Sequence, residues 1–251
     1  MKKRPLGQNF LIDPSIAQNI IQLANIQPNE HVVEIGPGKG VLTQLLIQQA
    51  DSLTAIELDP KLCRELQNRF SGSPAFKLIE GDAAKFDYGS MGTELNIVSN
   101  LPYYAATHIM KKLIHYRSHI HSMTLMLQKE VAERIINKDG KWSKLSVMCN
   151  FYATPEYLFT VSKSSFLPEP KVESAVIKFK IKTPPQIDQQ KFWQLVKVGF
   201  SSKRRTLINN LASGLKIEKE KAKEILENVG LDQKIRAEKL EIEDWINLSS
   251  G

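Results

Sequence analysis

Short apolar runs bounded by turn residues alternate with amphipathic stretches through the first half of the chain. The continuous runs predict buried strands, and the stretches with apolar residues three and four positions apart predict helices. The predicted strands are 31–35, 53–57, 76–79, 95–99 and 123–127. The predicted helices are 14–25, 41–47, one that starts at Asp59-Pro60, 106–115 and 128–137. Strands that alternate with helices predict a mostly parallel sheet with helices on both faces.

The pattern changes at Val147. Segments 147–152, 156–161 and 172–180 are rich in β-forming residues with no helical pattern between them, and they predict an antiparallel edge to the sheet. Pro184-Pro185 then marks a linker. Beyond it the chain shows only helical periodicity, which predicts a small helical bundle. We therefore expect an α/β domain over 1–183 and a helical domain over 186–251.

A glycine-rich turn follows the first predicted strand. Gly36, Gly38 and Gly40 differ in spacing from the dinucleotide pattern Gly-x-Gly-x-x-Gly, whose longer form shapes a helix N-terminus around a pyrophosphate. The shorter form lets a ligand lie close to the backbone without requiring a phosphate. Taken alone, the turn has a simpler interpretation as a tight connection between strand and helix.

Two acids at the ends of later strands add to the glycine turn. Glu57 ends the second predicted strand, where an acid binds ribose hydroxyls. Asp82 ends the third, where it is suited to accept a hydrogen bond from an adenine amino group. Because the carboxyl ends of parallel strands lie at one edge of a sheet, these groups together predict a nucleoside site there.

The tetrapeptide Asn100-Leu101-Pro102-Tyr103 follows the fourth predicted strand. A polar amide, a proline and an aromatic ring at a strand end are suited to hold a flat base beside a reactive centre. The alternative is a strand end followed by an ordinary turn, since Asn and Pro are common there.

Charge points to a polyanionic partner. The net charge is +7 and the sequence pI is about 9.2, which favours nucleic acid binding but is a weak signal alone. The positive charge is concentrated at Lys2-Lys3-Arg4 and at Lys203-Arg204-Arg205, which we expect on a helix. Charge runs of this kind are also common on solvated faces that bind nothing.

Composition excludes several classes of protein. A hydrophobic content of 42% and a charged content of 24% fit a soluble globular chain, and no apolar run is long enough to cross a membrane. The first residues lack the apolar core of a secretion signal, and the two cysteines lie in apolar contexts, so we expect a cytoplasmic protein. His115, His119 and His121 lie close together without Cys partners, and we expect no metal site.

Several motifs occur together in one order. The chain carries Gly7–Leu11, Glu34–Gly40, Ile56–Asp59, Gly81–Ala83, Asn100–Tyr103 and Phe166–Val172, followed by Phe200–Leu207, Asn209–Leu211 and Arg236–Leu240. With these motifs it resembles the S-adenosylmethionine-dependent rRNA adenine dimethyltransferases of the KsgA and Erm superfamily. The proline-rich loop and the C-terminal motifs resemble the KsgA branch. Tyr104 and Ala105 depart from the pattern, because KsgA proteins more often carry Asn and a β-branched residue there.

The resemblance implies a Rossmann-like methyltransferase fold that binds S-adenosylmethionine and releases S-adenosylhomocysteine. It implies that Asn9 and Leu11 close over the cofactor, that Gly36 lies against its methionyl part, and that Gly38 also binds the cofactor. The remaining cofactor contacts that it implies are those of Glu57 with the ribose, Asp82 with the adenine and Asn100 where cofactor and substrate meet.

For catalysis, the resemblance places the target adenine at the tetrapeptide. The Asn100 side chain and the Leu101 carbonyl then accept the hydrogens of the adenine amine, while Pro102 stiffens the turn. Tyr103 stacks on one face of the base. Phe166 is the candidate for the opposite face, although core packing is the ordinary role of a lone Phe.

The substrate follows from the resemblance alone. It implies dimethylation of two adjacent adenosines near the 3′ end of small-subunit rRNA, within an immature small subunit, by a monomer whose Lys203, Arg204 and Arg205 contact RNA phosphates. One alternative is an Erm-type methylase of large-subunit rRNA. Another is a ribosome-assembly factor that acts chiefly by binding.

Overall fold

The computed structural model describes residues 8–250, which fall into two compact units. The first unit extends to Ala132 and resumes over Thr154–Ile181. The second comprises Glu133–Ala153 and the residues from Lys182 onward. No helix within the described residues is long and apolar enough to cross a membrane.

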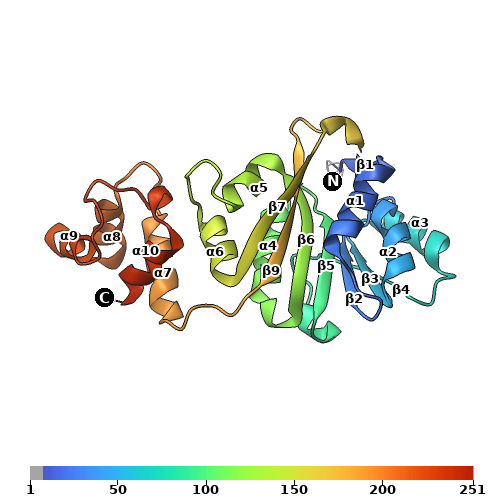
Figure 1. Ribbon diagram of the computed structural model, residues 1–251, viewed down its shortest axis with the longest axis horizontal. Coiled ribbons are helices and arrows are strands. Elements are labelled where there is room, and N and C mark those ends of the chain that lie inside the picture. Colours follow the sequence, from blue (N-terminus) through green and yellow to red (C-terminus); the bar gives the residue numbers. More distant parts are fainter. Residues whose placement is uncertain (1–7, 251) are drawn as a thin grey trace, which may run out of the picture. The chain divides into compact units, whose positions relative to one another are not determined.

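A seven-stranded sheet is the centre of the first unit (Figure 1), in the order β4-β3-β2-β5-β6-β9-β7. The strands β2 to β6 pair in parallel, whereas β9 pairs antiparallel with β6, as expected for the edge of the sheet. The strands are β2 His31–Ile35, β3 Ser52–Glu57, β4 Phe76–Glu80, β5 Leu95–Asn100, β6 Ile120–Gln128, β7 Ala153–Val161 and β9 Ser174–Ile181. The Rossmann-like fold predicted from the sequence is therefore confirmed.

Helices lie on both sides of this sheet. They are α1 Pro14–Ala24, α2 Val41–Gln49, α3 Pro60–Phe70, α4 Ala106–His115 and the short α5 Lys129–Ile135. The Asp-Pro signals act as expected: Asp13 accepts a hydrogen bond from the Ser15 amide at 3.0 Å, and Asp59 accepts one from the Lys61 amide at 2.8 Å. The buried faces of α1 and α2 pack with side chains of the strands in one hydrophobic cluster.

The strand order reverses between β2 and β5. After β2 the chain adds β3 and β4 on one side, then returns to place β5 on the other side of β2. The Ser99 hydroxyl donates a 2.5 Å hydrogen bond to the Ile35 carbonyl and joins the two strands at their carboxyl ends. Ligands of open α/β sheets bind at such a reversal point, because the loops diverge there and leave a crevice.

Residues 147–152 are helical, and the strand predicted there is wrong. They belong to α6, Lys144–Tyr152, whose start is fixed by a capping box. The Ser143 amide donates to the Ser146 hydroxyl at 2.6 Å, and the Ser146 amide donates to the Ser143 hydroxyl at 3.2 Å. The apolar run has no polar face because α6 is buried on several sides, so its periodicity resembles that of a strand.

The second unit is helical, with α7 Gln189–Gly199, α8 Leu207–Leu215, α9 Lys219–Glu227 and α10 Ile242–Ser250. It also includes 133–153, which the sequence assigned to the first domain. The Trp142 amide donates to the Glu238 carbonyl at 2.8 Å, and the Lys239 ammonium donates to the Gly140 carbonyl at 3.0 Å. These long-range bonds join the segment to the C-terminal helices, and no local pattern in the sequence indicates them.

Candidate active site

A cavity of about 570 Å³ lies at the carboxyl edge of the sheet. Its walls come from the loops after β2, β3, β4 and β5 and from the segment before α1. The predicted site residues that line it are Asn9, Leu11, Gly36, Gly38, Glu57, Asp82, Asn100, Leu101, Pro102 and Tyr103. Segments distant in the sequence therefore meet at one cavity, as the strand-end pattern predicts.

The glycine turn forms one wall of the cavity. Gly36, Gly38 and Gly40 all have positive φ, the left-handed conformation that other residues adopt at a cost. A Cβ on Gly38 would come within 3.1 Å of the Phe10 ring, and one on Gly40 within 2.7 Å of the Phe70 ring. The turn therefore needs glycine both for its backbone conformation and for the close packing of two aromatic rings.

Glu57 is buried and fixed by the backbone around it. One carboxylate oxygen accepts the Gly38 amide at 3.1 Å, and the other accepts the amides of Leu58 at 2.8 Å and Asp59 at 3.0 Å. Because each carboxylate oxygen has two acceptor sites, the oxygen bonded to Gly38 keeps capacity for a ligand hydroxyl. The glycine turn and the acid are thus one hydrogen-bonded structure.

Asp82 lines the cavity beyond the end of β4. Its Oδ1 accepts the Ala84 amide at 2.9 Å, and its Oδ2 lies 3.7 Å from the Lys85 ammonium. Tyr104 lines the same cavity and is 55% exposed. Partial burial raises the pKa of the Tyr104 hydroxyl, and the charges of Glu57 and Asp82 raise it further.

The tetrapeptide connects β5 to α4. Asn100 is the last residue of β5, and the Leu101 amide donates to the Met126 carbonyl of β6 at 3.1 Å. The Pro102 carbonyl accepts the amides of Ala105 at 3.0 Å and Ala106 at 2.9 Å, which starts α4. These bonds fix the backbone that follows Asn100, along the cavity wall.

Tyr103 is partly buried, and its hydroxyl lies 2.5 Å from the Ser174 hydroxyl. Burial raises the pKa of the Tyr103 phenol, and the hydrogen bond from Ser174 lowers it by less. The Tyr103 ring is therefore held at its hydroxyl as well as through its backbone. Ser174 was not among the predicted site residues.

The segment before α1 closes over the cavity. Phe10–Leu11 forms strand β1, which pairs antiparallel with β8, Phe166–Leu167. The Asn9 amide donates to the Pro168 carbonyl at 2.7 Å, and the Lys39 ammonium lies 5.1 Å from the centre of the Phe10 ring. Gly7 of the same motif, and Lys2-Lys3-Arg4, lie outside the described residues.

Phe166 does not line the cavity. It is 3% exposed and packs in the hydrophobic cluster with Leu11 and the inner side chains of α1. Its pairing with Leu11 turns the ring toward the core, so its place favours the packing role and does not support the expected stacking on a base. The exposed residue of this strand is its neighbour Leu167.

Glu34 is a cavity residue that the sequence motifs did not assign to the site. It is 1% exposed, and its carboxyl accepts a 2.6 Å hydrogen bond from the Thr43 hydroxyl of α2. Burial raises the pKa of Glu34 to about 8, and the nearby charge of Glu57 raises it too. An acid inside a buried strand, two residues before a glycine turn, is the signal that indicates such a site.

Lys203, Arg204 and Arg205 belong to the second unit and are exposed. They lie in the turn between α7 and α8, so the expectation that they lie on a helix is wrong. Asn210 explains the turn: its buried side-chain amide donates to the carbonyls of Gly199 at 2.6 Å and Ser202 at 3.0 Å. These bonds replace the helical ones and end α7.

The three histidines near residue 120 have separate surroundings. His119 Nδ1 lies 2.7 Å from the Gly92 carbonyl oxygen, His121 lies 3.3 Å from the Glu94 carboxylate, and the His115 ring contacts Tyr116. Among residues 8–250 there is no group of three or more side chains arranged to hold a metal ion.

The donor set of the cavity fits a cationic nucleoside. Three carboxyl groups, those of Glu34, Glu57 and Asp82, line it, and glycine backbone forms the wall between them. The carboxylates of Glu57 and Asp82 favour positive charge such as a sulfonium or an ammonium, whereas Glu34, whose pKa is raised to about 8, is neutral at pH 7. Bare backbone admits a ligand closely. The amide of Asn100 and the ring of Tyr103 lie on the wall beyond them.

Comparisons with known proteins identify one family. The family model for ribosomal RNA adenine dimethylase matches residues 1–250. A protein of Hydrogenovibrio crunogenus named ribosomal RNA small subunit methyltransferase A is 42% identical, over 99% of this chain and 95% of its own. Its namesake from Alkaliphilus oremlandii is 37% identical, over 96% and 88%.

Solved structures give a similar result. The 23S rRNA methyltransferase ErmE matches with a TM-score of 0.79 and 25% identity, over 96% of this chain and 98% of its own. A dimethyladenosine transferase of Plasmodium falciparum matches with a TM-score of 0.79 and 27% identity, over 95% of each chain.

Proposed function

The chain belongs to the ribosomal RNA adenine dimethylase family, and from this premise we propose that it dimethylates two adjacent adenosines near the 3′ end of small-subunit rRNA. The enzyme is an S-adenosylmethionine-dependent methyltransferase. When bound, S-adenosylmethionine supplies an electrophilic methyl group on a sulfonium. The protein's own residues must hold the adenosine amine in line with that methyl.

Cofactor binding is assigned to the acidic side of the cavity. Gly36 and Gly38 present bare backbone, and the free acceptor capacity of Glu57 suits the ribose hydroxyls. Asp82 suits an adenine amino group, since among the described residues its Oδ2 contacts only the exposed Lys85 ammonium, 3.7 Å away. Asn9 and Leu11 cover the cavity, and the hydrogen bond from the Asn9 side-chain amide to the Pro168 carbonyl holds this segment in place.

Target recognition is assigned to the tetrapeptide. The adenine amine is a poor nucleophile because its lone pair is conjugated with the ring. The Asn100 side-chain oxygen and the Leu101 carbonyl each accept one amine hydrogen, which favours a pyramidal nitrogen with its lone pair directed into the cavity. Tyr103 stacks on the base, a contact worth about 1–3 kcal/mol, comparable to the cost of extruding a base. Catalysis is then mainly orientation.

RNA contact outside the cavity is assigned to Lys203, Arg204 and Arg205. They are exposed on a turn, where three cations are free to meet phosphates. We assign the substrate to an immature small subunit in the cytoplasm and the active form to a monomer, on the family resemblance.

The observation that supports this function best is that Asn100 and Tyr103 line the same cavity as Glu57 and Asp82. This supports a cofactor site and a base site within one cavity. The test is incubation with labelled S-adenosylmethionine and, separately, undermethylated small subunits, naked small-subunit rRNA and large subunits, followed by mapping of modified bases. We expect two dimethylated adjacent adenosines in the small-subunit RNA only.

The structural match to a 23S rRNA methyltransferase supports a second candidate, the large-subunit substrate. The higher identity to the small-subunit enzymes favours the first. Label confined to large-subunit RNA would reverse the choice. Tight binding of small subunits with no label in any RNA would favour an assembly factor instead.

A further inference from the structure

Ser174 is buried and hydrogen-bonded to the active-site tyrosine. It is the first residue of β9, it is 0% exposed, and its hydroxyl lies 2.5 Å from the Tyr103 hydroxyl. A buried hydroxyl needs a partner, because leaving it unpaired costs about 1–3 kcal/mol. The two residues therefore satisfy each other across 71 positions of sequence.

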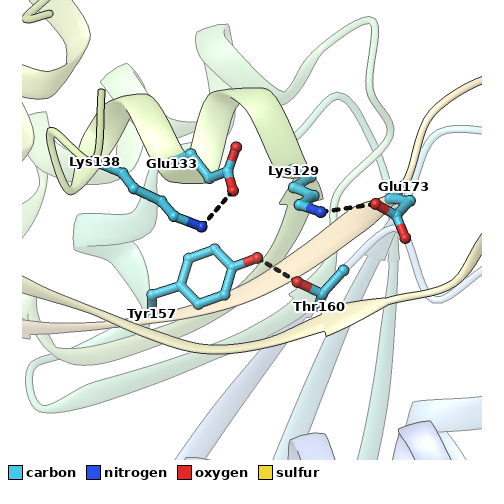
Figure 2. Close-up of polar contacts among 6 residues, drawn as sticks. All are labelled: Lys129, Glu133, Lys138, Tyr157, Thr160 and Glu173. Carbon is cyan, nitrogen blue, oxygen red and sulfur yellow. Dashed lines mark hydrogen bonds and ion pairs between the residues drawn. The ribbon is translucent and has the colours of Figure 1, made fainter. Parts of the chain in front are cut away.

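The backbone around Ser174 is held firmly. Ser174 pairs with Gln128 in the antiparallel ladder of β6 and β9. Its neighbour Glu173 is held by Lys129: the Lys129 amide donates to the Glu173 carbonyl at 3.0 Å, and the Lys129 ammonium lies 2.8 Å from the Glu173 carboxylate (Figure 2). The hydrogen-bond partner of Tyr103 thus lies at a strand end whose backbone is held from both sides.

A tyrosine ring on a cavity wall otherwise has rotameric freedom that it loses when a base stacks on it. Freezing such a side chain at the moment of binding costs about 0.5–1.5 kcal/mol. A hydrogen bond at the far end of the ring restricts it beforehand. Functional side chains held by such supporting contacts keep the geometry that the reaction needs.

We propose that Ser174 is a positioning residue for methyl transfer, which fixes the Tyr103 ring in the orientation that receives the target adenine. The proposal rests on the proposed function, since it takes an RNA adenosine as the group that Tyr103 meets. Ser174 touches neither cofactor nor base and acts only through the tyrosine hydroxyl.

The test is a double-mutant cycle of Ser174→Ala and Tyr103→Phe. We expect each single change to lower kcat/KM for undermethylated small subunits about three- to tenfold, mainly through KM for RNA, the scale of one hydrogen bond. The kcat/KM of the double variant should equal that of the less active single variant, because both changes remove the same hydrogen bond. The dissociation constant for S-adenosylhomocysteine, measured by calorimetry, should stay unchanged.

A matched control separates positioning from stability. Ser122 is another buried serine of this sheet, whose hydroxyl donates to the Asn96 side chain at 2.6 Å on the far part of β6. Ser122→Ala should lower the melting temperature and leave KM for RNA unchanged. If Ser174→Ala does the same, or if the two changes at 103 and 174 multiply, the proposal is overturned. If the wild-type protein labels no small-subunit RNA, the proposed function fails instead.

Discussion

In the proposed mechanism Asn100 has two tasks: its side-chain oxygen accepts a hydrogen bond from the target amine, and its backbone ends strand β5. Asn100→Ala keeps the Leu101–Met126 backbone bond and removes only the amide. We expect kcat to fall about 100-fold or more, the usual cost of losing one preorganised polar group at a reacting centre. Cofactor affinity should change by less than about tenfold, since Glu57 and Asp82 remain.

Single-turnover methylation and calorimetry with S-adenosylhomocysteine check this prediction. Asn96→Ala is the control, because Asn96 is an amide at the start of the same strand and bonds Ser122, away from the cavity. A variant at position 100 that turns over like the wild type would remove Asn100 from its role.

Glu34 makes stability depend on pH. Burial raises its pKa from 4.5 to about 8, so the folded state holds a proton that the unfolded state releases. Between pH 4.5 and 8 the free energy of unfolding therefore falls as pH rises, by at most about 1.4 kcal/mol per pH unit from this group. Gln at position 34 does not titrate, so Glu34→Gln should make the free energy of unfolding less dependent on pH in this range.

Melting temperatures of both proteins from pH 5 to 8.5 measure the effect, without cofactor. The difference between variant and wild type should grow with pH. Glu65→Gln, an exposed acid of α3, should leave the wild-type pH dependence intact. Parallel curves for wild type and Glu34→Gln would mean that Glu34 is ionised throughout.

Among elements, the glycine turn shows how a loop and a helix determine each other. Gly40→Ala adds a Cβ that meets the Phe70 ring at 2.7 Å and the Leu66 side chain at 3.0 Å, at a φ of +77°. The left-handed conformation costs about 1–2 kcal/mol and the crowding about 1–3 kcal/mol more. We expect the melting temperature to fall by several degrees.

Phe70→Leu tests whether crowding contributes. Leucine is shorter than the ring, so the double variant should be less destabilised than the sum of the two single variants in urea unfolding. Strict additivity would assign the whole cost of Gly40→Ala to backbone conformation.

Element prediction from the sequence succeeded where the local signal and the tertiary structure agree. Asp13-Pro14 and Asp59-Pro60 start helices in the structure as expected, and Glu57 and Asp82 reach one cavity because parallel strands share an edge. It failed for 147–152, because this helix is buried on several sides and its apolar residues therefore do not follow a helical spacing. The role of Phe166 was also not predictable from the sequence. Its ring direction depends on the pairing of its strand with Leu11, and no sequence motif indicates that pairing.

At the scale of the molecule, the candidate active site and the cluster of positive charge belong to different units. The cavity lies in the first unit, whereas Lys203, Arg204 and Arg205 lie in the second. The sequence predicted the linker near Pro184 but not the inclusion of 133–153 in the helical unit. That grouping depends on contacts such as Trp142 with Glu238, which are distant in sequence.

Changing Lys203, Arg204 and Arg205 together to Ala should weaken binding of small subunits and flatten its salt dependence. Each phosphate that the variant no longer neutralises changes the slope of log affinity against log salt by about 0.7–0.9. Filter binding at several salt concentrations measures the slope. Replacing Lys221, Lys223 and Lys234 removes the same charge from exposed positions of the same unit and should change the slope less. Equal slopes for both triple variants would indicate only a general effect of net charge.

The ribbon of β1 and β8 has a consequence for how the protein is made. Asn9 bonds to a carbonyl 159 positions later in the chain. At about 5–20 residues per second, the ribosome needs roughly 8 to 30 seconds of elongation to supply that partner. The glycine turn and the first strands are thus made before the strand β8, whose pairing with β1 holds the closing segment in place. A fully closed cofactor cavity therefore marks a first unit whose translation is nearly finished.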